Sequence, residues 1–96
     1  GHGERRQSTL NGEKKMTAWV QVELKKTVLD PQGKAIQAAL AKLGYQGVAE
    51  LRQAKMFEIQ LQPGLDRAEA HRQVERAARE VLTNPVIEEY SIRWDE

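Results

Sequence analysis

The side chains that could perform chemistry in this chain are few, and they do not form a familiar reactive group. Its histidines are His2 and His71. Neither has a partner at metal-ligand spacing, and a zinc site needs three or four converging ligands. Glu88 and Glu89 are adjacent in a predicted strand, so their carboxyl groups point to opposite faces and cannot act as an acid–base pair. Ser91 has no base near it in the sequence. The residues therefore predict no catalytic, cofactor-binding or metal-binding constellation.

Binding of phosphate or nucleic acid has little support either. The glycines are isolated, and no glycine-rich phosphate loop of common spacing is present. A row of arginines is interleaved with glutamates: Arg67, Arg72, Arg76 and Arg79 with Glu69, Glu75 and Glu80. This pattern predicts spaced ion pairs on a solvated helix. Residues 17–96 hold 11 Lys or Arg against 12 Asp or Glu, so no strong net field attracts nucleic acid or an anionic membrane.

Length and composition predict one globular domain. The chain has 96 residues, of which 40% are hydrophobic and 30% charged. It has no cysteine, which excludes a disulfide framework, and no apolar run near the ~20 residues that span a bilayer. Without a secretory segment, the cytoplasm is the expected compartment. Residues 1–15 are polar and aperiodic, and we interpret them as a disordered tail or cloning remnant. Met16 is then the expected natural start, and residues 16–96 the single domain.

The first half of the domain predicts a strand followed by a helix. Residues 18–25 alternate apolar and polar side chains, as a half-buried strand does. Asp30 can cap the next helix, and Pro31 suits its first turn. Apolar residues recur at helical spacing up to Gly44, which can end the helix: Ile36, Ala39, Leu40 and Leu43. We expect this helix over residues 31–43.

The second half predicts a hairpin, a helix and a last strand. Residues 48–61 contain two extended stretches, the first marked by Ala49 and Leu51, with a bend near residues 53–55. Asp66 caps a second helix that ends at residues 83–84, before Pro85. Residues 86–94 return to alternation. The order βαββαβ predicts an α+β ferredoxin-like sandwich, a four-stranded antiparallel sheet with two helices on one face.

Aromatic residues gather in the first and last strands, which are neighbours in this topology. Trp19 is expected on the outer face, whereas Tyr90 and Trp94 share the other face of their strand. The last two belong either to the core or to a subunit interface, where aromatics are enriched. A folded part of about 80 residues has a modest core of its own, so association with other chains is expected.

Three phrases, VLDPQGKAIQAALAKLGY, LRQAKMFEIQL and NPVIEEYSI, resemble the PurS family in order and spacing. These are the small subunits of bacterial and archaeal phosphoribosylformylglycinamidine (FGAM) synthase, a ligase complex of de novo purine biosynthesis. The resemblance implies a non-catalytic accessory subunit, itself a homodimer or homotetramer. Its implied partners are a glutaminase subunit (PurQ), which releases ammonia from glutamine, and a synthetase subunit (PurL), which uses ATP and Mg. It implies no cofactor on this chain, no nucleic acid and no membrane.

The resemblance also marks candidate interface residues. The positions that match the family's phrases are Asp30, Pro31, Gln32, Gly33, Lys55, Asn84 and Pro85. Their other interpretation is capping and turn geometry. One departure is Ala54, where the family often has glycine, so the bend before Lys55 is expected to be less tight.

Two other functions share this topology. One is a regulatory domain that senses an amino acid or nucleotide at a dimer interface. The other is an enzyme of acylphosphatase type, but its arginine-bearing glycine loop after the first strand is replaced here by VLDPQG.

Overall fold

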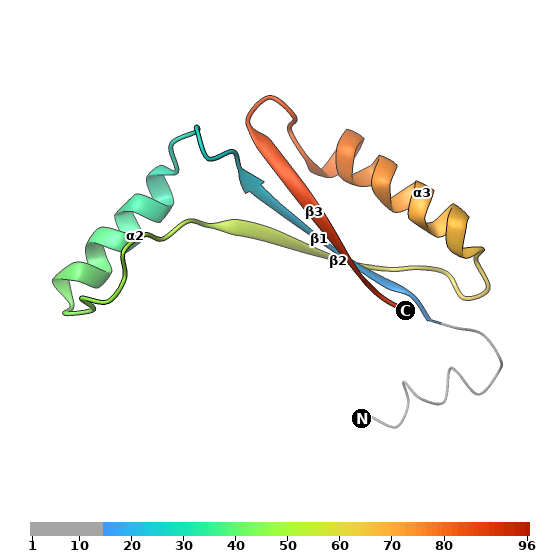
Figure 1. The fold of residues 1–96 in the computed structure, drawn as a ribbon, viewed down its shortest axis with the longest axis horizontal. Coiled ribbons are helices and arrows are strands. Elements are labelled where there is room, and N and C mark those ends of the chain that lie inside the picture. The colour runs from blue at the N-terminus through green and yellow to red at the C-terminus, as the bar shows by residue number, and fades with distance from the viewer. Residues whose placement is uncertain (1–14) are drawn as a thin grey trace, which may run out of the picture.

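The computed structural model describes residues 15–96, which form an α+β fold with one antiparallel sheet (Figure 1). The elements, in order, are β1 (Thr17–Leu24), α2 (Pro31–Lys42), β2 (Ala54–Gln60), α3 (Arg67–Ala77), the π-helical turn η1 (Ala78–Leu82) and β3 (Glu88–Asp95). Except for Lys15, the predicted tail lies outside the described residues.

The sheet has β1 in its centre, with β2 and β3 antiparallel on either side. Val20 of β1 pairs with Phe57 of β2 and Ile92 of β3. Because neighbouring residues in register point to the same face, the alternation seen in each strand builds one apolar face. The predicted four-stranded sheet is not confirmed, since the described residues form three strands.

The core lies between this face and α3. Its fully buried members are Ala18, Val20 and Val22 of β1 with Val74 and Ala78 of the second helix. Half-buried apolar residues from β3, from β2 and from the position just after β2 pack against them: Phe57, Ile59, Leu61, Tyr90, Ile92 and Trp94. The apolar face of the sheet and the apolar stripe of α3 thus pack against each other, as the sequence predicts.

The second helix begins and ends close to the predicted residues. Oδ2 of Asp66 accepts from the backbone N–H of Glu69 at 3.2 Å, which confirms the cap. The helix widens into the π-helical turn and stops before Thr83, whose backbone is extended. The predicted end at residues 83–84 is therefore correct within one residue.

The first helix begins at its predicted residue and ends one residue early, but it does not cover the sheet. Pro31 opens α2, Leu43 caps its end, and Gly44 follows with φ 98°. Figure 1 shows α2 beyond the end of the strands, on the other side of the molecule from α3. The only buried residue of α2 is Gly33. The prediction of two helices on one face is thus not confirmed for the single chain, in which Asp30 bonds the start of α2 to Gln53 and the rest of the helix lies off the sheet.

The predicted first strand of the hairpin is also absent among the described residues. Residues 48–53 instead run back along α2 (Figure 1), and side chains of α2 and its cap bond three of their backbone groups. Gln37 donates to the carbonyl of Ala49 and accepts from the N–H of Leu51, each at 3.2 Å. Groups bonded to a helix side chain in this way are unavailable to a β-ladder. The alternation of residues 48–53 therefore marks an extended return segment, not a strand.

Candidate functional site: the junction of β1, α2 and β2

Asp30 is the centre of the place where β1, α2 and β2 meet. Its Oδ1 accepts from the N–H of Gly33 at 2.9 Å, and its Oδ2 from the N–H of Gln53 at 2.8 Å. The residue is only 5% exposed. The N–H groups of Gln53 and Gly33 hold the pKa of the Asp30 carboxyl below its ordinary value. Asp30 is therefore a charged clasp that joins the start of α2 to the start of β2, as well as the predicted helix cap.

Arg52 adds a second clasp at the same place. Its Nη2 lies 3.1 Å from the carbonyl oxygens of both Lys25 and Val28, which follow β1. A guanidinium group presents several donors in a fixed plane, so one side chain can hold two carbonyls. Together with Asp30, Arg52 fixes the direction in which α2 leaves the sheet.

Several predicted site residues line one groove at this end of the sheet. It has a volume of ≈ 460 Å³, and its lining includes Asp30, Pro31, Gln32, Gln53, Lys55 and Glu88. The ammonium group of Lys55 lies 3.8 Å from Oε2 of Glu88, across β1. The structure therefore brings the helix start and Lys55 together, as neighbouring parts of one surface.

Asn84 and Pro85 reach the same end of the sheet through Glu88. Oε1 of Glu88 accepts from the N–H of Asn84 at 2.8 Å, and Oδ1 of Asn84 accepts from the N–H of Val86 at 3.1 Å. The N–H of Lys25 donates to the carbonyl of Ile87 at 2.9 Å. Glu88 was not predicted as a site residue, although it connects Lys55 with the Asn84–Pro85 turn. No local signal in the sequence distinguishes it from its neighbour Glu89.

The three aromatic candidates lie on two different faces. Trp19 is on the face away from α3, where the Arg93 guanidinium carbon lies 5.5 Å from its ring centroid. Tyr90 and Trp94 are on the α3 side and pack against the core. The Trp94 ring stacks on His71, with centroids 4.0 Å apart. Trp19 is thus half-exposed on the open face, whereas Tyr90 and Trp94 join β3 to α3.

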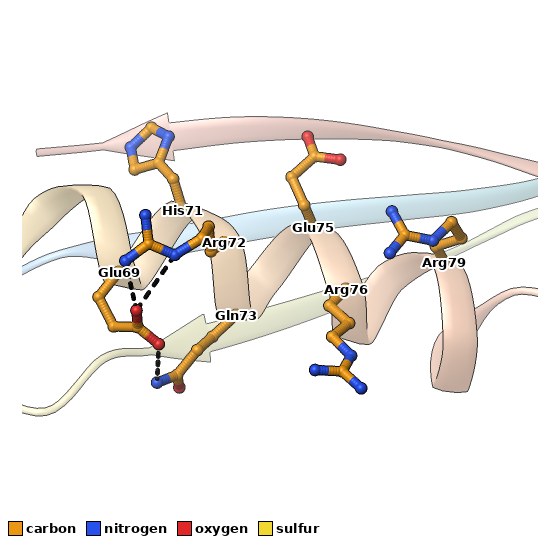
Figure 2. A pocket seen from close by; sticks show the side chains of 7 residues that line it. All are labelled: Glu69, His71, Arg72, Gln73, Glu75, Arg76 and Arg79. Atoms are coloured by element: carbon orange, nitrogen blue, oxygen red, sulfur yellow. Dashed lines mark hydrogen bonds and ion pairs between the residues drawn. The ribbon is translucent and has the colours of Figure 1, made fainter.

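The outward face of α3 carries predicted ion pairs, of which Figure 2 shows the one between Arg72 and Glu69. Arg72 pairs with Glu69 at 2.5 Å and Arg76 with Glu80 at 3.1 Å. Hydrogen bonds from Gln73 and Arg72 lower the pKa of Glu69. The hollow between these side chains has a volume of ≈ 480 Å³ and is shallow. Its charges are largely paired, as expected for a solvated helix.

The described part of the chain holds neither a metal cluster nor a membrane-spanning helix. Within residues 15–96, no group of three His, Cys, Asp or Glu side chains converges as a metal ion requires. No helix in this range is long and apolar enough to cross a bilayer.

Comparisons with known proteins agree on one family. The PurS model, described as phosphoribosylformylglycinamidine (FGAM) synthase, matches residues 17–96. The PurS subunit of Archaeoglobus fulgidus is 41% identical over 81 residues, which cover 84% of this chain and 100% of the relative. The subunit of Mycobacterium leprae is 40% identical over 75 residues, covering 78% and 90%.

Solved structures agree in fold. The crystal structure of Methanocaldococcus jannaschii PurS has a TM-score of 0.75 and 36% identity, covering 84% of this chain and 96% of that one. A chain of the Thermotoga maritima PurLQS structure has a TM-score of 0.77 and 28% identity, covering 85% and 99%. The chain therefore belongs to the PurS family of FGAM synthase subunits.

Proposed function

We propose that this chain is the non-catalytic accessory subunit that bridges the glutaminase PurQ and the synthetase PurL, so that ammonia passes between them. The observation that carries the proposal is the match over residues 17–96 to a family whose Thermotoga maritima member lies in a PurLQS structure. Free ammonia is protonated and diluted in bulk water, so its transfer requires the two sites to be joined. A docking subunit supplies shape and contact area for that purpose. The expected compartment is the cytoplasm.

The proposed interface residues form a suitable docking surface. The bond between Asp30 and the N–H of Gly33 lies inside the junction and holds its backbone in place. Exposed side chains on its surface remain available to a partner: Pro31, Gln32 and Lys55. Rigid, pre-organised surfaces lose less conformational entropy on binding. In this proposal ATP, Mg and glutamine are bound by the partner subunits, and no cofactor by this chain.

Self-association is the second part of the proposal, as a homodimer or homotetramer. The single chain leaves Trp19 on an open sheet face and leaves α2 without a partner surface. A complete ferredoxin-like layer, with a second helix beside α3, then requires more than one chain.

Reconstitution with PurL and PurQ tests the bridging role. Adding this chain should raise glutamine-dependent FGAM formation by at least about tenfold, which corresponds to about 1.4 kcal/mol of barrier. Synthesis from added ammonium chloride should change far less, because free ammonia bypasses the glutaminase. A chain that stays monomeric and never alters glutamine-dependent turnover contradicts the proposal.

A further inference from the structure

The sheet face opposite α3, called the open face below, carries an excess of negative charge. Side chains alternate along a strand, so the odd-numbered residues of β1 and β3 and the even-numbered residues of β2 point to this face. Those of β2 and β3 are exposed, and those of β1 are half-exposed. Four carboxylates lie there with one guanidinium group, a formal charge of −3: Glu23, Glu58, Glu89 and Asp95 with Arg93.

Two of these carboxylates oppose each other across neighbouring strands. Glu23 of β1 is the register partner of Glu89 of β3, on the same face of the sheet. Like charges in such a cross-strand pair destabilise a sheet. Within residues 15–96, neither residue takes part in an ion pair, nor does Glu58 or Asp95. The fold therefore keeps a repulsion that glutamine at either position would remove, which indicates a use outside the single chain.

Trp19 indicates which groups the open face can accept. It lies between Glu58 and Arg93 in the register of the three strands, and the guanidinium carbon of Arg93 is 5.5 Å from its ring centroid. An indole ring attracts cations over its face, and carboxylates beside it add to that attraction. Met56 on the same face is 52% exposed, and both tryptophan and methionine are enriched in protein interfaces. The open face thus fits a protein surface that carries arginine or lysine side chains.

Charge argues against other occupants. The open face of a second copy also carries −3, so two open faces laid on each other would repel. The phosphates of nucleic acid and of an anionic membrane are repelled for the same reason. Of the two partners proposed above, the synthetase handles ATP and a phosphoribosyl compound, which are anions, whereas the glutaminase acts on glutamine, which has no net charge. A positive surface field is therefore expected on PurL.

We propose that the open face docks on a basic surface of PurL, where Glu23, Glu58 and Glu89 accept arginine or lysine side chains around Trp19. The proposal rests on the bridging role and deepens it by naming a surface and its partner. The junction of β1, α2 and β2 lies at one end of the sheet and stays available to a second partner. One chain can then contact two different subunits at once, as bridging requires.

Removal of the two opposed carboxylates tests the docking. Glu23→Gln with Glu89→Gln should weaken binding to purified PurL by about fivefold or more at low salt, because two charges are lost from the contact. The same variant should resist urea as well as wild type or better, since the cross-strand repulsion is removed. Glu50→Gln with Glu75→Gln is the matched control, which makes the same change in net charge at exposed positions off the open face.

Biolayer interferometry gives the Kd for PurL, and circular dichroism follows unfolding in urea. The control should bind PurL as tightly as wild type. Equal Kd values for the two double variants overturn the proposal. Weaker binding by the open-face variant together with a loss of stability would assign the two carboxylates to the fold and also overturn it.

Ser91→Lys tests the same face without removing a charged side chain. Ser91 is exposed on the open face, opposite Gln21 in register. A lysine there repels a basic partner, so binding to PurL should again weaken by about fivefold or more. Gln46→Lys, in the exposed turn after α2, is the control. Wild-type affinity of Ser91→Lys for PurL overturns the proposal, and a lower mass by light scattering than the control would place the open face between copies instead.

Turnover separates failure of this docking from failure of the bridging function. If the open-face variants bind PurL normally while wild-type chain stimulates glutamine-dependent turnover, bridging stands and PurL docks elsewhere. If they lose affinity for PurQ and keep it for PurL, the assignment to PurL is overturned. If they lose affinity for PurL but wild-type chain never stimulates turnover, the docking stands and bridging fails.

Discussion

Gly33 lies in the first turn of α2, where its N–H donates to Asp30. A Cβ at this position would overlap Oδ2 of Asp30 and lie 3.0 Å from the carbonyl of Leu51. Alanine is favoured over glycine within a helix by about 1 kcal/mol, but here the methyl must displace the carboxylate that holds β2. The overlap with Asp30 should therefore cost more than the helix propensity of alanine gains. We expect Gly33→Ala to lower the Tm by about 5 °C or more.

The control for this substitution is Gly47→Ala. A Cβ on Gly47 meets no atom within 4 Å, and its φ is not in the left-handed region. Thermal unfolding followed by circular dichroism should therefore give an unchanged Tm. A Gly33→Ala variant that is as stable as wild type would show that the Asp30 clasp contributes little.

Asp30 also predicts a specific pH dependence. Its pKa is lowered in the folded chain by hydrogen bonds from Gln53 and Gly33, relative to an ordinary value of 3.8. The stability that it contributes is thus present above the unfolded carboxyl's pKa and is lost as the pH falls through the folded one. The stability difference between wild type and Asp30→Asn should be largest near pH 7 and shrink below about pH 4.

Urea unfolding at both pH values measures this difference. Other carboxyls with lowered pKa, such as Glu69 and Glu80, titrate alike in both proteins and cancel in the comparison. A difference that stays constant between the two pH values would mean that the charge of Asp30 is not what holds the junction.

Local rules predicted only part of this site. Asp30, Pro31 and Gly44 follow from capping and turn chemistry, which acts within a few residues. Arg52 and Glu88 could not be predicted, because their partners lie far along the chain. Arg52 binds carbonyls 24 and 27 residues away, and Glu88 becomes a link only once β1 lies between β2 and β3.

At the scale of elements, periodicity predicted the helices well and the hairpin poorly. The predicted helix over residues 31–43 differs from α2 by one residue at its end. The stretch marked by Ala49 and Leu51 fails as a strand because Gln37 of α2 bonds its backbone. Alternation shows that a segment is extended, but whether it joins a sheet depends on which groups its backbone meets.

The two tryptophans test whether the two sheet faces have different roles. Trp94→Asp removes the stack on His71 and places a carboxylate against the core, so it should destabilise the fold by about 2 kcal/mol or more. Trp19→Ala loses a cation–π contact with Arg93 of about 0.5–1 kcal/mol. If Trp19 lies in an interface, its variant should weaken self-association while the helical signal is kept.

Urea unfolding and light scattering on both variants separate these effects. An unchanged mass for a folded Trp19→Ala chain would remove the open face from the interface. A Trp94→Asp variant that unfolds at the same urea concentration as wild type would show that the stack on α3 is not part of the core.

For the molecule as a whole, the net charge does not show how unevenly the charge is distributed along the chain. A nearly neutral total predicts no attraction to nucleic acid, yet the segment with α2 and the rest of the described fold carry opposite charges. In the same way, the pattern βαββαβ predicted one self-contained sandwich, whereas the single chain leaves a helix uncovered. Sequence periodicity indicates that an apolar face of an element must be buried, but it does not indicate which molecule covers that face.

Charge reversal on α2 tests whether these opposite charges contribute to the self-association proposed above. Lys34→Glu with Lys42→Glu brings the charge of residues 25–55 from +4 to zero. Both lysines are exposed and lie off the apolar stripe of α2, so the substitutions leave the stripe itself unchanged, and circular dichroism checks that the helices are kept. Since interactions between such charges are screened beyond about 10 Å at 0.1 M salt, wild-type self-association should weaken as salt rises. The double variant should associate more weakly at low salt and lose most of that salt dependence. Sedimentation across a salt series gives the Kd at low salt and its dependence on salt. A variant with the same Kd as wild type at low salt would show that the opposite charges of residues 25–55 and the rest of the fold do not contribute to self-association.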